Sequence, residues 1–320
     1  MKPWAALPLI LLAMPPAAGS AQSGSVVESL KSRTFHVSLS GDVGYLSVTA
    51  GLRVVDLSDV AHPTELATLV LPQSATGSVV DGDRVYVAQG PGGVFCVDVS
   101  DPSSPSVIAE IPTPGSAMMV DKSGPVLAVA DGSVGASFCD VSDPRKPRLT
   151  GTSAWPGYVR GLRFYQDKLY VCAGTSGVVV MTVSGDGKAT ELGRCQTGGD
   201  ARDISFYRGW AFVADGKAGV SMLDISPSSG PVLLGTFPTR DLAHGVVFHK
   251  GYVFVADGLK GVAGFKFDKS GSLDYLRQLD TRTGYADKVT VHRRKLFVAN
   301  DFKGMLVFDV HYPDKPKLIE

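Results

Sequence analysis

The chain alternates short apolar segments with polar turns over most of its length. Between Asp241 and Phe267 the segments read AHGVVFHKG, YVFVADG and GVAGFKF, and LDYLRQL follows shortly afterwards. Such segments, about four to seven residues long, rich in Val, Phe, Tyr and Leu and bounded by Gly, Asp or Pro, are typical of strands joined by turns. No window shows the start and stop signals of a helix. The pattern therefore predicts an all-β protein.

The segments recur in a fixed register. Glycine occupies seven equivalent positions, the first six spaced by 42 residues and the last by 43: Gly51, Gly93, Gly135, Gly177, Gly219, Gly261 and Gly304. Four short antiparallel strands in a unit of about 40 residues describe a propeller blade, and both faces of a blade pack against its neighbours. We therefore predict a single seven-bladed β-propeller of four-stranded antiparallel blades over residues 35–320. The strands of a blade are named a to d from the axis outward.

The turn between strands c and d also recurs. It reads DLSDVAHP, DVSDPSSP, DVSDPRKP, DISPSSGP and DVHYPDKP, in which Asp and Ser can satisfy turn amides and Pro presets the backbone. Blades four and six carry SGDGKA and DKSGSL instead, which lack the ligand count and terminal Glu of an EF-hand. We interpret these turns as structural.

This combination of motifs resembles the LVIVD-repeat family of bacterial and archaeal surface or exported proteins. The match is plainest in residues 84–105 (RVYVAQGPGGVFCVDVSDPSSP) and in residues 252–267, and it extends over residues 35–320. The resemblance implies a β-propeller outside the cytoplasm. It implies no catalytic residues for this chain, because a fold does not by itself define an activity.

The N-terminus predicts export. A short basic start precedes an apolar run from Leu7 to Met14, and small residues follow up to Ala21, as in a secretory signal peptide cleaved after Ala21. The run is too short to cross a bilayer comfortably. We expect a periplasmic or extracellular protein without residues 1–21. Residues 22–34 then either precede the ring or supply a further strand, Val26–Leu30, to the last blade.

Charge and cysteine content narrow the function classes. The 31 basic and 31 acidic residues are balanced and form no long like-charge block, which argues against a nucleic-acid or anionic-membrane surface.

The expected strand positions place the cysteines too far apart to form a disulfide. We predict four buried free thiols: Cys96, Cys139, Cys172 and Cys195.

The strand order predicts one variable face of the disc. The d-to-a and b-to-c connections share this face, which we call the loop face, and they differ between blades. One column at the start of the a strands reads Thr76, Met118, Arg160, Arg202, His244 and Asp287. Arginine forks match carboxylate and phosphate geometry, so this column predicts binding of an anionic molecule or an acidic side chain. The candidate ligand-binding residues are Arg160, Arg202, His244, Asp287, Asp203, Asp241, Trp155 and Tyr158.

A structural interpretation of the same residues stays open. Polar side chains at a channel mouth are commonly solvated, and arginines can pair with nearby aspartates. The repeated acids of the b-to-c loops, such as Asp131, Asp215 and Asp257, can hold their own turns. His249 and His292 share a column in adjacent blades but have no third ligand, so no metal site is predicted.

The chain also lacks a catalytic motif. Neither a nucleophile elbow of the G-x-S-x-G type nor a P-loop occurs, and we predict no catalytic residue and no cofactor. We expect a binding scaffold for a protein partner that acts through the loop face, without nucleic acid and without membrane insertion. The alternative is an extracytoplasmic enzyme or a binder of small anions in the central funnel. The enzyme hypothesis requires Arg160, Arg202 and His244 to point inward together, whereas a scaffold predicts an exposed patch with aromatics such as Trp155 and Tyr158.

Overall fold

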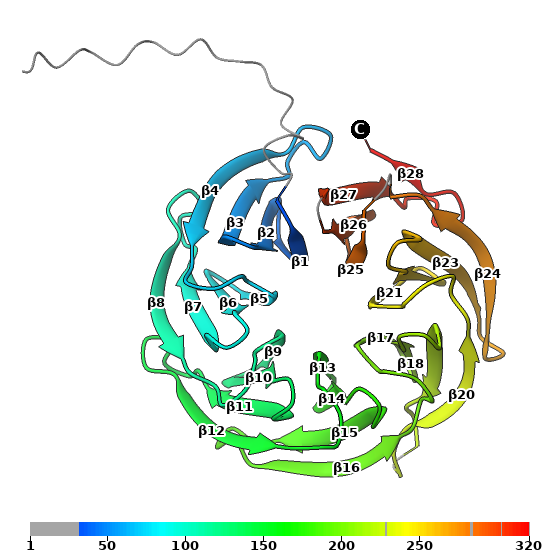
Figure 1. The fold of residues 1–320 in the computed structure, drawn as a ribbon, viewed down its shortest axis with the longest axis horizontal. Helices are drawn as coiled ribbons and strands as arrows, with labels where there is room; N and C mark the ends of the chain where they lie inside the picture. The colour runs from blue at the N-terminus through cyan, green and yellow to red at the C-terminus, as the bar shows by residue number, and fades with distance from the viewer. Residues whose placement is uncertain (1–31, 228, 282–283, 302, 320) are drawn as a thin grey trace, which may run out of the picture.

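The computed structural model describes residues 32–227, 229–281, 284–301 and 303–319. These residues form seven four-stranded antiparallel sheets arranged in a ring around a central channel (Figure 1). No helix occurs among them. The predicted seven-bladed propeller is therefore confirmed. The predicted signal peptide and the strand proposed for Val26–Leu30 lie outside the described residues.

Each blade is a meander in which consecutive strands are hydrogen-bonded neighbours. Blades 1 to 4 consist of β1 (Thr34–Ser40), β2 (Val43–Val48), β3 (Gly51–Asp56) and β4 (Thr64–Val70); β5 (Gly77–Asp81), β6 (Arg84–Ala88), β7 (Val94–Asp98) and β8 (Ser106–Ile111); β9 (Met119–Ser123), β10 (Val126–Ala130), β11 (Ala136–Asp140) and β12 (Arg148–Ser153); and β13 (Gly161–Tyr165), β14 (Lys168–Cys172), β15 (Val178–Val183) and β16 (Ala189–Cys195).

Blades 5 to 7 follow the same order. They consist of β17 (Asp203–Tyr207), β18 (Trp210–Ala214), β19 (Val220–Asp224) and β20 (Val232–Phe237); β21 (Gly245–His249), β22 (Tyr252–Ala256), β23 (Val262–Asp268) and β24 (Ser272–Leu279); and β25 (Ala286–His292), β26 (Lys295–Asn300), β27 (Gly304–Asp309) and β28 (Lys317–Leu318).

The hydrophobic core lies between blades. The cluster between blades 5 and 6, for example, joins Phe212 of β18 to Val253 of β22 and Phe265 of β23. Phe212 also stacks on Phe248 of β21, with ring centroids 5.5 Å apart. Because both faces of strands b and c are covered in this way, all five residues of β10 are buried and the strand reads as a continuous apolar run.

The c-to-d turns are built as the sequence predicts. The carboxylate of Asp98 accepts a hydrogen bond from the backbone N–H of Ser100 at 2.9 Å, and Asp140 accepts one from Ser142 at 2.9 Å. The turn bond lowers the pKa of Asp98. For Asp140, the hydrogen bond from Arg148 and then the bonds from Ser142 lower the pKa to about 2. The repeated Asp and Ser residues therefore shape the turn.

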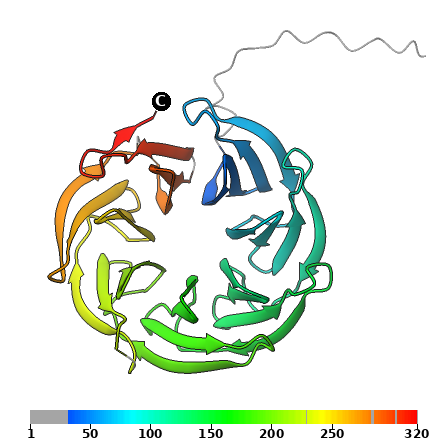
Figure 2. The same cartoon turned by 180° about the vertical axis from the view of Figure 1, so that it is seen from behind.

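Blade 7 packs directly against blade 1, as Figure 2 shows from behind. The backbone of Thr34 pairs with that of Asp301, and the Arg33 guanidinium contacts the Asp301 carboxylate with an Nη2–Oδ2 distance of 3.0 Å. On the opposite face, His292 Nε2 donates to the backbone oxygen of Gly41 at 2.8 Å. The described residues thus close the ring through blade-to-blade contacts.

All four cysteines are free and buried, as predicted. Burial raises the pKa of the Cys96 thiol to about 11 and that of Cys139 to about 12, so these thiols stay protonated at neutral pH. Among the described residues, no helix is long and apolar enough to span a membrane.

Candidate functional site at the channel and its mouth

Backbone bridges fix the predicted column of residues at the mouth of the channel. The b-to-c loops of blades 3, 4 and 5 pair with the chain just before strand a of the next blade: Gly132 with Val159, Gly174 with Ala201, and Gly216 with Ala243. Arg160, Arg202 and His244 each follow one of these paired residues directly. Their backbone positions are therefore set by contacts between blades.

Four of the predicted residues form one network of charges, which we call the mouth network, together with Asp200. Arg160 Nη1 donates to Asp200 Oδ1 at 3.1 Å, and Arg202 Nε donates to Asp200 Oδ2 at 2.9 Å. Arg202 Nη1 lies 3.1 Å from the ring nitrogens of His244, and His244 Nδ1 lies 3.4 Å from Asp287 Oδ1. The predicted residues converge, and Asp200 pairs with both arginines.

The network presents its two ends to solvent. The side chain of Arg160 is 35% exposed and that of Asp287 is 31% exposed, whereas those of Arg202 and His244 are 16% exposed. Two aromatic residues contact the network: the Arg160 guanidinium lies 4.7 Å from the ring centroid of Tyr158, and the hydroxyl of Tyr285 contacts His244 Nε2. The geometry provides a polar rim in which both arginines are paired with an acid.

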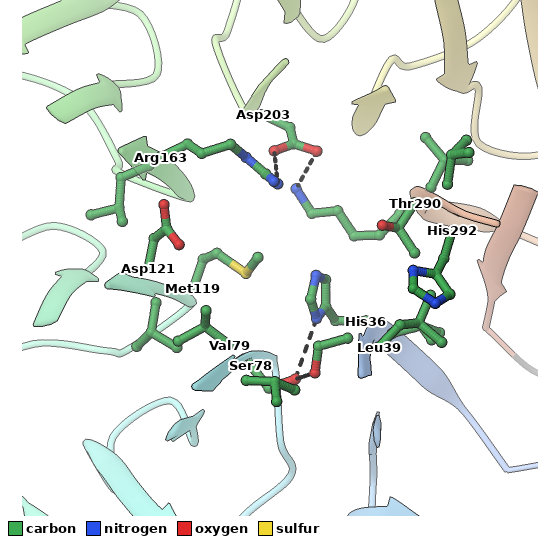
Figure 3. A pocket seen from close by; sticks show the side chains of 18 residues that line it. His36, Leu39, Ser78, Val79, Met119, Asp121, Arg163, Asp203, Thr290 and His292 are labelled. Atoms are coloured by element: carbon green, nitrogen blue, oxygen red, sulfur yellow. Dashed lines mark hydrogen bonds and ion pairs between the residues drawn. The ribbon is translucent and has the colours of Figure 1, made fainter. Parts of the chain in front are cut away.

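Three predicted residues lie elsewhere. Asp241 accepts the backbone N–H of Leu259 at 2.9 Å and so holds a loop. Trp155 is only 8% exposed, packs into the core between blades 3 and 4, and donates from Nε1 to Glu191 at 3.2 Å. The expectation of an exposed aromatic patch containing Trp155 is therefore wrong. Asp203 points into the channel below the mouth (Figure 3).

The repeated acids of the b-to-c loops hold the neighbouring d-to-a connections. Asp257 is buried and accepts the backbone N–H groups of Arg240 and Asp241 at 3.0 and 2.9 Å. Asp131 accepts the backbone N–H of Gly115 at 3.1 Å in the same way, and the hydroxyl of Thr113 at 2.8 Å. These contacts support the structural interpretation of the repeated Asp and show that it braces the loop face.

Replacing Asp257 with alanine should lower the free energy of unfolding by about 1–3 kcal/mol, because two partly buried backbone amides lose an acceptor that is itself fully buried. The matched control is Asp98→Ala, in which an exposed carboxylate bonded to one turn amide is removed and water can replace it. Urea unfolding of both variants measures the difference. A loss for Asp98→Ala as large as that for Asp257→Ala would contradict the bracing role.

The channel contains a cavity of about 240 Å³ lined by the innermost strands of six blades, β1, β5, β9, β13, β17 and β25 (Figure 3). Asp203 of β17 forms ion pairs with two cationic side chains of this cavity. Its Oδ2 lies 3.4 Å from Lys288 Nζ, and its Oδ1 lies 3.9 Å from Arg163 Nη2. The Asp203 carboxylate also accepts the backbone N–H of Val246 at 3.2 Å. Sequence reasoning found Asp203 but missed its two cationic neighbours.

Burial dominates the electrostatics of this cavity. It lowers the pKa of His36 to about 3, with the positive charges of Lys288 and Arg163 adding to the effect, so the ring is neutral. Burial also raises the pKa of Asp121, whose Oδ2 accepts the backbone N–H of Phe164 at 2.7 Å. Within the described ranges, no three His, Cys, Asp or Glu residues are grouped so as to hold a metal ion.

Sequence comparison identifies the repeat. The LVIVD repeat matches residues 33–69, 74–113 and 198–239, which cover most of blades 1, 2 and 5. No curated protein shows significant sequence similarity to the chain.

Solved structures of several propellers share the fold. A protein from Bacteroides fragilis, provisionally assigned as a 6-phosphogluconolactonase, is 13% identical with a TM-score of 0.73, over 90% of this chain and 93% of that one. BamB from Moraxella catarrhalis is 14% identical with a TM-score of 0.58, over 85% and 80%. The computationally designed protein Ika8 is 12% identical with a TM-score of 0.68, over 91% and 86%. At these identities the likeness concerns the fold alone.

Proposed function

We propose, on the premise that this chain is a seven-bladed β-propeller containing LVIVD repeats, that it is an exported binding scaffold for a protein partner. The partner contacts the loop face. Propeller loops can vary without disturbing the core, and here the Asp-braced connections hold that face rigid before any partner binds. A preformed surface loses less conformational entropy on association.

The mouth network is the observation that carries this proposal. Arg160 and Arg202 both pair with Asp200, and His244 lies beside Asp287. The basic groups therefore do not converge as free donors on one point, and the two ends of the network are exposed. The enzyme hypothesis required Arg160, Arg202 and His244 to act together on a substrate. Because Asp200 occupies both arginines, that hypothesis loses its main support, and a polar contact rim fits the geometry better.

Exposed lysines favour an acidic partner. Lys217, Lys260 and Lys303 lie in the b-to-c loops of blades 5, 6 and 7, and all three are exposed. The exposed Arg240 lies in the neighbouring d-to-a connection of blades 5 and 6. These exposed basic side chains can steer an oppositely charged partner and raise its association rate at low salt.

Affinity capture from an envelope extract tests this proposal, with residues 22–320 as the bait. The charge-reversal variant Lys217→Glu/Lys260→Glu should lose the partner, and its association rate at low salt should fall by about tenfold or more. The variant Arg160→Ala/Arg202→Ala should also weaken capture, because it removes the exposed basic end of the mouth network.

A matched variant on the opposite face provides the control. Lys146→Glu/Lys315→Glu reverses two exposed charges in c-to-d turns and should retain the partner. Equal capture by the loop-face variants and the unaltered protein would reject the loop face as the contact surface.

A further inference from the structure

Two cationic side chains in the channel have donors that the protein does not use. Arg163 and Lys288 approach Asp203 at 3.9 and 3.4 Å, which are ion-pair distances longer than a good hydrogen bond. Lys288 Nζ donates to the backbone oxygen of His244 at 3.3 Å. Arg163 Nε is buried and has no hydrogen-bond partner within the part of the chain that the structure describes. The Arg163 side chain as a whole is 43% exposed, so its terminal guanidinium nitrogens, held only by the long contact to Asp203, stay open to the channel.

The opposite wall of the cavity offers neutral polar groups. Figure 3 shows the His36 ring standing in the cavity, with Ser78 on one side of it and the Arg163 and Asp203 side chains across from it. His36 Nδ1 lies 3.4 Å from Ser78 Oγ, which in turn lies 2.8 Å from Ser38 Oγ. With Ser78 at Nδ1, Nε2 is the nitrogen of His36 that is left to face a ligand.

We infer that the central channel binds a small oxyanion, a carboxylate or a phosphate, held between Arg163 and Lys288 on one side and His36 on the other. Guanidinium and ammonium donors converging with a neutral imidazole match the oxygen atoms of such a group. The cavity of about 240 Å³ has the volume of about eight water molecules, which suits a small oxyanion.

This site is independent of the proposed interface. None of the residues that line the cavity belongs to the mouth network. The lining continues instead through Thr290 to His292 at the far end of β25. Loss of partner binding and loss of anion binding are therefore separable by mutation.

Two acidic residues, Asp203 and Asp121, line the same cavity and affect its net charge. Asp203 neutralises part of the two cationic charges, and Asp121 lies on the neighbouring wall beside Arg163 (Figure 3). Both acids accept a backbone amide, from Val246 and Phe164 respectively, so they are held in place. An incoming anion competes with Asp203 for the cations, which predicts that removing its charge strengthens binding.

Isothermal titration calorimetry of the mature chain with inorganic phosphate and with acetate, at constant ionic strength in chloride, tests the site. Binding of phosphate alone or acetate alone identifies the oxyanion class, and binding of both supports the shared chemistry. Arg163→Gln should weaken binding by about 10- to 100-fold, as expected for a charge-assisted hydrogen bond. The control Arg145→Gln, at an exposed turn arginine, should leave it unchanged.

The variant Asp203→Asn provides the more decisive test of the anion site. Asparagine keeps an acceptor for Val246, removes the negative charge, and should tighten binding by about tenfold. A gain in affinity cannot arise from misfolding. The inference would be overturned if neither phosphate nor acetate bound, or if the unaltered protein, Arg163→Gln and Asp203→Asn bound with equal affinity.

Discussion

Replacing Gly177 with alanine should lower the free energy of unfolding by about 2–5 kcal/mol. Gly177 precedes β15 with a φ of 76°, a left-handed conformation that costs a residue with a side chain about 1–2 kcal/mol. A Cβ atom there would also overlap the carbonyl oxygen of Cys195 on the adjoining strand β16. That oxygen belongs to the backbone and cannot swing away, so overpacking adds to the loss.

Gly82→Ala is the matched control, because Gly82 has a φ of 57° but a Cβ there would meet nothing within 4 Å. This variant should show only the conformational cost of about 1–2 kcal/mol. Urea unfolding of the two variants separates the terms. Equal losses would show that the close approach to strand d does not explain the glycine.

The same close approach explains why the sequence reveals the fold so clearly. In the equivalent position of other blades, a Cβ would overlap the backbone oxygen of the last residue of strand d, as at Gly93, Gly135, Gly219 and Gly261. The requirement is local, repeats once per blade, and has only one chemical solution. The spacing of these glycines therefore gives the length of one blade directly, even where the other residues of the blades differ.

The contacts at the mouth depend on information that the repeat does not carry. The column of Arg160, Arg202 and His244 could be aligned because a strand position is periodic. The acids that pair with these residues are set by the path of the d-to-a connections. Asp200 lies in such a connection and accepts hydrogen bonds from both arginines. Trp155 lies in such a connection too, and no alternation of polar and apolar residues there indicates that it turns into the core.

The channel cluster was missed for a different reason. Arg163 and Lys288 lie on strands a of blades 4 and 7, which are far apart in the sequence and meet only across the axis. Neither residue belongs to the column at the mouth, and they occupy different positions along their strands. Alignment of the repeats compares equivalent positions, so it cannot show that side chains at unequal heights converge on Asp203.

Lowering the pH from 6.5 towards 3 should destabilise the protein through His36 by about 1.4 kcal/mol per pH unit. The folded protein holds the pKa of His36 at about 3, mainly by burial and then by Lys288 and Arg163, against 6.5 for the free side chain. Between pH 6.5 and about 3, His36 is therefore protonated in the unfolded chain but stays neutral in the folded protein. The contribution of His36 to stability is complete above pH 6.5 and is lost as the pH falls to about 3.

Urea unfolding between pH 7 and pH 4.5 measures this effect, since the turn acids Asp98 and Asp140, with lowered pKa values, lose their contribution only at lower pH. Asp121 and Asp215 act in the opposite sense, because burial raises their pKa and favours the folded state as they take up protons. The contribution of His36 to this loss, about 2–3 kcal/mol over this range, should be absent in His36→Gln and should persist in His311→Gln, at an exposed turn residue. His249, whose pKa is also lowered by burial, keeps its own contribution in both variants. Equal pH slopes in the two variants would mean that His36 is not the group that the folded protein keeps neutral.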